Sequence, residues 1–135
     1  TVNPTTSQPA PELFLEVFNR YKAEGKEIVY IGISSVLSGT LQSARIAKEM
    51  CGYDKIYLVD SLSATAGIDI LVRVACSMRD SGENAEAIAE RLEQLVPKIR
   101  VYAFLISDEP TTNFVPKKLF LSELVTLTKS PLYFD

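Results

Sequence analysis

Residues 27–44, EIVYIGISSVLSGTLQSA, decide the fold of this chain because they contain a change of pattern. After Glu27 the chain is rich in β-branched residues and almost continuously apolar up to Ile33, as in a strand that is covered on both faces. From Leu41 onward the apolar residues recur at helical spacing instead. The connection between the two segments holds four hydroxyl side chains and Gly39. The stretch therefore predicts a buried parallel strand, a hydroxyl-rich loop and a helix.

The same alternation of strands and helices extends on both sides of this stretch. Apolar residues at helical spacing predict four helices, and β-branched apolar runs predict three strands. The expected helices cover residues 11–24, 41–51, 66–81 and 83–96, and the expected strands cover residues 27–33, 55–60 and 101–106. Strands that alternate with helices form parallel βαβ units with right-handed crossovers. The expected fold class is therefore α/β, with a three-layer α/β/α arrangement and a mainly parallel sheet.

Local signals and the loss of pattern near the end of the chain set the expected boundaries. Pro11 suits the first turn of the first helix, and Asn84 is placed to cap the last one. No linker interrupts residues 1–106, which we expect to form one α/β domain. Residues 107–135 carry several prolines and a mixed apolar stretch, and they predict no definite element.

The composition excludes several classes of partner. The chain has 14 basic and 17 acidic residues and no basic run, so we expect no nucleic acid partner. No segment reaches the roughly 20 apolar residues of a membrane span, and no signal peptide opens the sequence, which favours a cytoplasmic protein. Because the chain has no histidine and no CxxC spacing, Cys51 and Cys76 form no metal or redox motif and are expected to be buried thiols. We expect no metal and no cofactor.

The hydroxyl-rich loop has two interpretations. Ser34, Ser35, Ser38 and Thr40 could donate hydrogen bonds to an anion, with Gly39 allowing close backbone approach at the start of a helix. Ligands of open α/β sheets collect beyond the carboxyl ends of the strands, where this loop lies. The alternative is that Ser38 only caps the helix while Ser34 and Ser35 satisfy the backbone at the strand end. The loop alone leaves both interpretations open.

The residues available limit the chemistry of such a site. Neither of the glycine-rich nucleotide-binding patterns GxxxxGK[ST] and GxGxxG occurs, and a serine hydrolase lacks its histidine base and its GxSxG turn. Asp60 ends the second strand, but no second carboxylate is placed by the sequence to pair with it. Neutral hydroxyl and amide donors suit a carboxylate, which accepts several hydrogen bonds without a paired cation. An alternative is a phosphoryl or acyl transfer enzyme that uses SSVLSGT as an anion cradle.

Several short motifs together resemble the DegV family of bacterial fatty-acid-binding proteins. They are TSQP before a helix, ISS, LSGT followed by QSA, and VDS followed by a helix of small residues, and the resemblance covers residues 4–106. It implies a DegV-like N-terminal domain and a carrier without chemistry of its own, which delivers a long-chain fatty acid to a separate fatty acid kinase. It also implies that hydroxyls of the TSQP and SGT segments hold the acyl carboxylate. The implied ligand-binding residues are Thr6, Ser7, Ser35, Ser38, Gly39 and Thr40, with Thr6 and Ser38 as the principal donors.

The chain departs from the family pattern at its two ends. The resemblance places a further strand before Thr1 and a lipid-binding domain after the part seen here, so we expect a fragment of the N-terminal domain. After RVYAFLISD, the segment EPTTNFVPKK stands where the family has a leucine-rich turn and a Gly-Gly-Arg segment, and Ala10 stands where the family often has a serine cap. Apolar surface left uncovered in a fragment predicts self-association of the chain.

Overall fold

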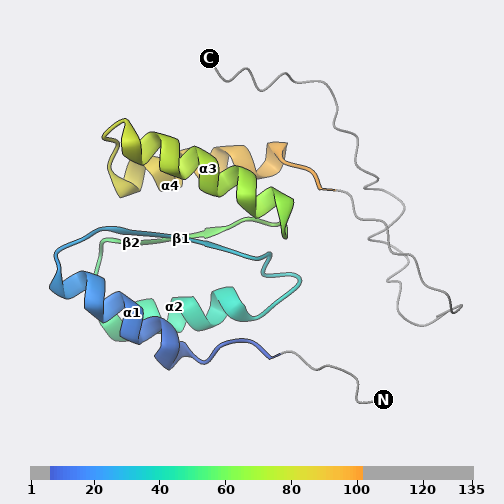
Figure 1. The fold of residues 1–135 in the computed structure, drawn as a ribbon. Helices are drawn as coiled ribbons and strands as arrows, with labels where there is room; N and C mark the ends of the chain where they lie inside the picture. The colour runs from blue at the N-terminus through green and yellow to red at the C-terminus, as the bar shows by residue number, and fades with distance from the viewer. Residues whose placement is uncertain (1–6, 102–135) are drawn as a thin grey trace, which may run out of the picture.

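A computed structural model describes residues 7–101, which form four helices, two strands and a short 3₁₀ turn (Figure 1). In chain order these are α1 (Pro11–Ala23), β1 (Ile28–Gly32), α2 (Thr40–Cys51), β2 (Ile56–Asp60), α3 (Ala66–Asp80), α4 (Ala85–Leu95) and the turn η1 (Val96–Lys98). The four expected helices and two of the expected strands are confirmed, with ends that differ by one or two residues. The expected strand 101–106 and the tail 107–135 lie outside the described residues, apart from Val101, which belongs to no strand.

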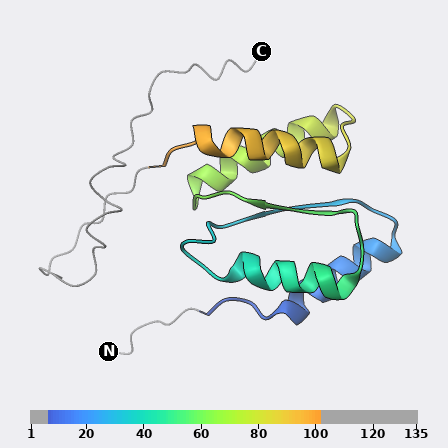
Figure 2. The same ribbon diagram turned by 180° about the vertical axis from the view of Figure 1, so that it is seen from behind.

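The two strands form a parallel pair between two layers of helices. Their register runs from Ile28 opposite Ile56 to Gly32 opposite Asp60. Helices α1 and α2 lie on one face of the pair, and α3 and α4 lie on the other (Figure 1, Figure 2). The described residues are therefore an α/β unit of three layers, as the alternation of elements in the sequence predicts.

Each face of the sheet has its own apolar core. On the side of α1 and α2, the buried residues are Phe18, Ala44, Ala47, Cys51 and Ile56. On the side of α3 and α4, they are Val59, Leu71, Ile88, Ala89, Leu92 and Val96. Ile56 and Val59 belong to the same strand but face opposite cores, because successive side chains of a strand point to opposite faces. The sheet is thus covered on both sides.

Two expectations about burial are wrong in part. Four of the five residues of β1, Ile28 to Ile31, are only half-buried, because β1 has a partner strand on one side alone among the described residues. Of the two expected buried thiols, Cys51 is buried in the first core, but Cys76 is half-buried on α3. Both errors have one cause: the apolar pattern of a segment does not tell which neighbours cover it.

Asn84 caps α4 as the sequence predicts, since its side-chain oxygen accepts a hydrogen bond of 2.8 Å from the Ala87 backbone N–H. We expect Asn84→Ala to lower the free energy of unfolding by about 1 kcal/mol, because this N–H loses its acceptor. Urea denaturation followed by circular dichroism measures the change. Asn84→Asp, which keeps a side-chain oxygen at the cap, should restore most of the loss, and equal stability of the alanine variant and the wild type would contradict the role of the cap.

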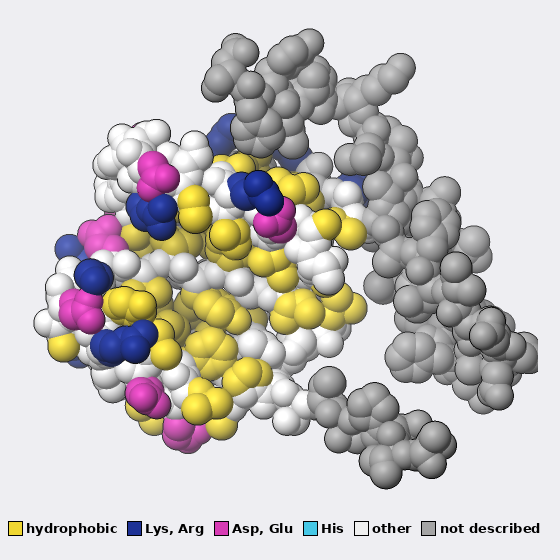
Figure 3. Space-filling model, in the orientation of Figure 1, with side chains coloured by type: hydrophobic (Ala, Val, Ile, Leu, Met, Phe, Trp, Pro, Cys, Tyr) yellow, Lys and Arg dark blue, Asp and Glu magenta, His cyan; other side chains and the backbone are white. Residues whose placement is uncertain are grey.

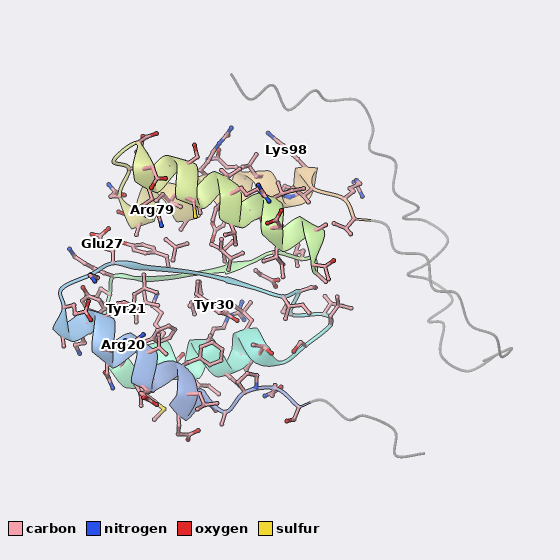
Figure 4. All side chains as sticks on the ribbon, viewed as in Figure 1. Arg20, Tyr21, Glu27, Tyr30, Arg79 and Lys98 are labelled. Carbon is pink, nitrogen blue, oxygen red and sulfur yellow. The ribbon has the colours of Figure 1, made fainter. Side chains whose placement is uncertain are left out.

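Glu27, just before β1, connects the beginning of β1 to the start of α4 by a hydrogen bond. Its carboxylate accepts a hydrogen bond of 3.0 Å from the Ala85 backbone N–H and lies 3.2 Å from the Lys55 ammonium nitrogen. These contacts lie at the end of the sheet where the strands begin (Figure 4). The Ala85 N–H first and the Lys55 side chain second hold the pKa of Glu27 below its usual value of 4.5.

This lowered pKa predicts a pH dependence of stability. Because the folded state holds the carboxylate in its charged form, the stabilisation is present above about pH 4.5 and is lost as the pH falls through the lowered pKa. We expect Glu27→Gln to flatten this part of the profile, measured by urea denaturation between pH 3 and pH 7. Lys55→Gln should keep most of the pH dependence, because the Ala85 N–H remains. A wild type and a Glu27→Gln variant with parallel profiles would show the assignment to be wrong.

The path of the chain brings several separate segments to one end of the sheet. The strands both end there, α2 and α3 begin there, and the segments before α1 and after η1 also lie there (Figure 1, Figure 2). Two contacts agree with this arrangement: Gln8 donates a hydrogen bond to Ser43 of α2, and Val101 lies close to Gly67 of α3. No helix among residues 7–101 is long and apolar enough to cross a membrane.

Candidate functional site

The hydroxyl-rich loop after β1 is a folded turn whose centre is Ser34. The Ser34 carbonyl accepts hydrogen bonds from the backbone N–H groups of Leu37, at 2.9 Å, and Ser38, at 3.1 Å. The Ser34 hydroxyl oxygen accepts a third from the Val36 N–H at 3.3 Å, and the residue is only 4% exposed. Ser34 therefore satisfies the backbone at the strand end, as the structural interpretation of this residue predicts, and it holds Ser38 at the beginning of α2.

A second loop, residues 61–65 after β2, lies against this turn. The Ser34 N–H donates to the Ser63 carbonyl at 2.9 Å, and the Ser35 N–H donates to Asp60 Oδ1 at 3.2 Å. The Ser61 hydroxyl, which is 1% exposed, donates to the Ser63 carbonyl at 3.1 Å and folds the second loop upon itself. The two loops therefore form one hydrogen-bonded unit.

Ser38 and Thr40 form a hydroxyl pair at the start of α2. Their side-chain oxygens are 2.8 Å apart, and Ser38 Oγ also accepts the Thr40 backbone N–H at 3.3 Å. A hydroxyl has one proton and two lone pairs. When the Thr40 hydroxyl donates to Ser38, this hydrogen bond and the one from the Thr40 N–H use both lone pairs of Ser38 Oγ. The proton of Ser38 is then free to bind a ligand. The N-cap of α2 is Gly39, without a side-chain cap, so of the two interpretations of this loop, the one in which Ser38 is the N-cap does not describe this helix.

Backbone donors surround this hydroxyl pair. The N–H groups of Gln42 and Ser43 both donate to the Gly39 carbonyl, at 3.0 and 3.2 Å. The N–H groups of Gly39 and Leu41 have no acceptor among residues 7–101. Such groups at a helix N-terminus carry partial positive charge and suit an anion. The start of α2 thus offers two amide donors beside one hydroxyl proton.

The segment before α1 reaches this place through Gln8. Its side-chain Nε2 donates to Ser43 Oγ at 3.3 Å, and its carboxamide occupies the space that a side-chain carbon on Gly39 would need. Gln8 of the TSQP segment and Gly39 of the SGT segment are therefore neighbours. Ser7 is exposed and has no hydrogen-bond partner in the described part of the chain. Thr6 lies outside the described residues.

The site includes features that the sequence did not indicate. Gln8 was not expected to contact the loop, although a glycine at position 39 is a signal of a close approach. The three exposed apolar side chains Val36, Leu37 and Leu62 lie on the two loops and are 74%, 56% and 60% exposed. Leu62 and Thr65 also have positive φ angles, 46° and 43°, which are uncommon for residues with a side chain. Their backbone conformations depend on the fold and cannot be seen in residue types.

Two cavities lie elsewhere in the described part of the chain. One of about 590 Å³ lies beside the end of α2 and is lined by Arg45, Tyr53 and Tyr57 among others. The other, of about 460 Å³, lies at the open edge of β1, where Figure 3 shows hydrophobic side chains at the surface between the two helix layers. Neither is lined by the candidate residues. Among residues 7–101, no three His, Cys, Asp or Glu side chains gather as a metal site would require.

The three-layer unit with its neutral donor site has close relatives among known proteins. The DegV family model matches residues 1–108. A DegV domain-containing protein of Clostridium acetobutylicum is 40% identical over 97 residues, which are 72% of this chain and 35% of that protein. YteA of Lactococcus lactis, also a DegV domain-containing protein, is 37% identical over 107 residues, which are 76% of this chain and 37% of that protein. The chain belongs to the DegV family.

Several solved structures of the family resemble this fold, and some of them are described by fatty acid binding. A DegV family protein of Thermus thermophilus, described by its fatty acid binding, matches with a TM-score of 0.65 and 34% identity, over 71% of this chain and 34% of that one. The fatty acid kinase B3 protein of Streptococcus pneumoniae, loaded with linoleic acid, matches with a TM-score of 0.59 and 31% identity, over 67% of this chain and 32% of that one. The chain thus spans about a third of the length of these relatives.

Proposed function

We propose that this chain provides the carboxylate-binding part of a long-chain fatty acid carrier. The observation that carries the proposal is the start of α2, where the Ser38 hydroxyl neighbours the N–H groups of Gly39 and Leu41, which have no acceptor among residues 7–101. In this proposal the three groups donate to one carboxylate. The described structures of relatives with bound fatty acids support it. Among residues 7–101, the carboxylate beside this loop, that of Asp60, already accepts two backbone N–H groups, which fits binding better than catalysis.

Each candidate residue has a distinct role in this proposal. Ser38 donates its proton to one carboxylate oxygen, and Thr40 orients Ser38 by donating to its oxygen. The position of Gly39 lets the backbone N–H groups and Gln8 approach. In this proposal, the exposed residues Ser35 and Ser7 add hydroxyl donors, and Thr6 is a principal donor by resemblance to the family. Two or three such hydrogen bonds satisfy a carboxylate without a paired cation.

The acyl chain is the part of the ligand that supplies most of the binding free energy. Burial contributes about 0.8 kcal/mol per methylene, so a 16-carbon chain gains roughly 12 kcal/mol when it is fully enclosed. The apolar side chains of Val36, Leu37 and Leu62 are exposed beside the donors and would border the first carbons. The enclosure of the remaining carbons, and the delivery of the acid to a fatty acid kinase in the bacterial cytoplasm, are proposed for the complete protein.

Other sequence-based expectations stay predictions. These are the division into a domain over 1–106 and a tail over 107–135, the origin of the chain as part of an N-terminal domain, and self-association. Val72 on α3 is 41% exposed and lines the cavity at the edge of β1, which is where we expect such an association to occur. The transferase alternative has no observation in its favour, because Asp60, the carboxylate beside the loop, already accepts two backbone N–H groups.

A comparison of an acid with an alcohol of the same length tests the carboxylate site in this chain. Octanoate and octanol are short enough to bind without a complete tunnel, and both can be titrated into ¹⁵N-labelled protein by NMR. We expect octanoate to shift the amide resonances of Gly39, Thr40 and Leu41 more than those elsewhere, and octanol to shift them little, because only the acid carries the charge that the N–H groups bind. Equal responses to both compounds would refute the site.

A further inference from the structure

Asp60 lies where the two loops of the candidate site meet. It is the last residue of β2, and one of its carboxylate oxygens, Oδ1, accepts two backbone N–H groups. One comes from Ser35 on the other loop, at 3.2 Å, and one from Leu62 on its own loop, at 3.0 Å. This single oxygen therefore joins the two loops.

The hydrogen bond between Asp60 and Ser35 connects Asp60 to the turn that contains the donor Ser38. Ser35 is part of the turn in which the Ser38 N–H donates to the Ser34 carbonyl. The other hydrogen bonds between the two loops join backbone groups, Ser34 N–H to the Ser63 carbonyl and Ser61 N–H to the carbonyl of Gly32. Among residues 7–101, the hydrogen bond that Asp60 accepts from Ser35 is therefore the only one between these loops that involves a side chain. It is the one that a substitution can remove.

The contact with Leu62 holds a residue in an uncommon conformation. Leu62 has a φ of 46°, in the left-handed region where a side chain other than that of glycine, asparagine or aspartate is unfavourable. Its side chain is 60% exposed, so burial of that side chain is incomplete. The hydrogen bond from the Leu62 N–H to Asp60 fixes the backbone at this position. Uncommon backbone conformations of this kind are found where a site needs them.

We propose that Asp60 is a positioning residue of the carboxylate site, which acts as a hydrogen-bond acceptor and not through its charge. A negative charge so close to the donors does not attract a second carboxylate, so its value to the site lies in fixing Ser35, and through the turn Ser38, and in fixing Leu62. This inference rests on the proposed function, since it names what holds the donors of that site in place.

Amide hydrogen exchange tests the positioning without any ligand. In Asp60→Ala, we expect the amides of Ser35, Leu62 and Ser38 to exchange at least about 10-fold faster relative to amides in the core, because their acceptor or their turn is lost. Asp60→Asn keeps an oxygen at Oδ1 and should restore the protection. Asp54→Ala and Asp54→Asn are matched controls at the other end of the sheet, where Asp54 makes no hydrogen bond in the described part of the chain. Unchanged exchange in Asp60→Ala would overturn the proposal.

Octanoate affinity then tests the connection to function, with thermal unfolding as the measure of stability in each variant. We expect Asp60→Ala to weaken octanoate binding about 10-fold, the effect of about one lost hydrogen bond to a charged group. Asp60→Asn should bind octanoate as well as the wild type. This difference in affinity should remain even if Asp60→Asn and Asp60→Ala lose the same amount of thermal stability. An asparagine variant as weak as the alanine variant would show that the charge acts instead, and would overturn the proposal.

The two proposals can fail separately. A wild type that binds no octanoate, with exchange results as expected for the Asp60 variants, would remove the proposed function and leave Asp60 as the residue that orders these loops. A wild type that binds octanoate, with an Asp60→Ala variant of equal affinity and equal exchange, would leave the proposed function and remove the role of Asp60.

Discussion

Leu92→Ala is expected to lower the free energy of unfolding by about 2–5 kcal/mol, because it leaves a cavity in the core between the sheet and the pair α3 and α4. Leu92 is 0% exposed and packs in one cluster with Val59 of β2 and Leu71 of α3. A domain of this size is stable by only about 5–15 kcal/mol, so the loss is a large share of the total. Urea denaturation followed by circular dichroism measures it.

A second leucine in a helix serves as the control. Leu13 on α1 is 60% exposed, so Leu13→Ala removes the same atoms without opening a cavity in either described core. We expect it to change the stability by less than about 0.5 kcal/mol. Similar losses in the two variants would mean that Leu92 is not enclosed in solution and that the helix pair does not cover the sheet as described.

Ser38→Ala is expected to weaken octanoate binding by about 10- to 150-fold, which corresponds to the 1.5–3 kcal/mol of a hydrogen bond to a charged group. Ser38 Oγ also accepts the Thr40 N–H, so the variant should lose about 1 kcal/mol of stability as well, the net contribution of one hydrogen bond. A residue with a purely structural role would show only the second effect. Isothermal titration of octanoate and urea denaturation separate the two.

The partner donor and a matched serine complete this experiment. Thr6→Val keeps the shape of the side chain and removes its hydroxyl, and we expect its effect on affinity to be non-additive with that of Ser38→Ala, because both donors serve one carboxylate. Ser77 is exposed near the end of α3, while the loops lie at its beginning, and Ser77→Ala should leave the affinity unchanged. Octanoate affinity that is the same in the Ser38→Ala variant and the wild type would contradict the assignment of Ser38.

Much of the fold could be predicted because its signals are local. The helices end where the periodic apolar residues end, and Asn84 and Gly52 mark a beginning and an end with residue types that suit those positions. The strand segments are recognisable from their β-branched residues. What failed was burial: β1 is half-buried and Cys76 is half-buried, because the exposure of a side chain depends on segments that are distant in the sequence.

The candidate site, like the fold, has features that the sequence predicts and features that only the tertiary structure shows. The sequence by itself determined that hydroxyls and a glycine follow β1 and that a helix begins there, and the family resemblance joined this loop to the TSQP segment. Only the tertiary structure decided that Ser38 pairs with Thr40, and that Gln8 contacts Gly39. It also decided that Asp60 accepts an N–H from a loop 25 residues away. Residue types state which hydrogen bonds a side chain can make, but the fold selects the partner, because the groups meet only after the strands have paired and the helices have packed on them.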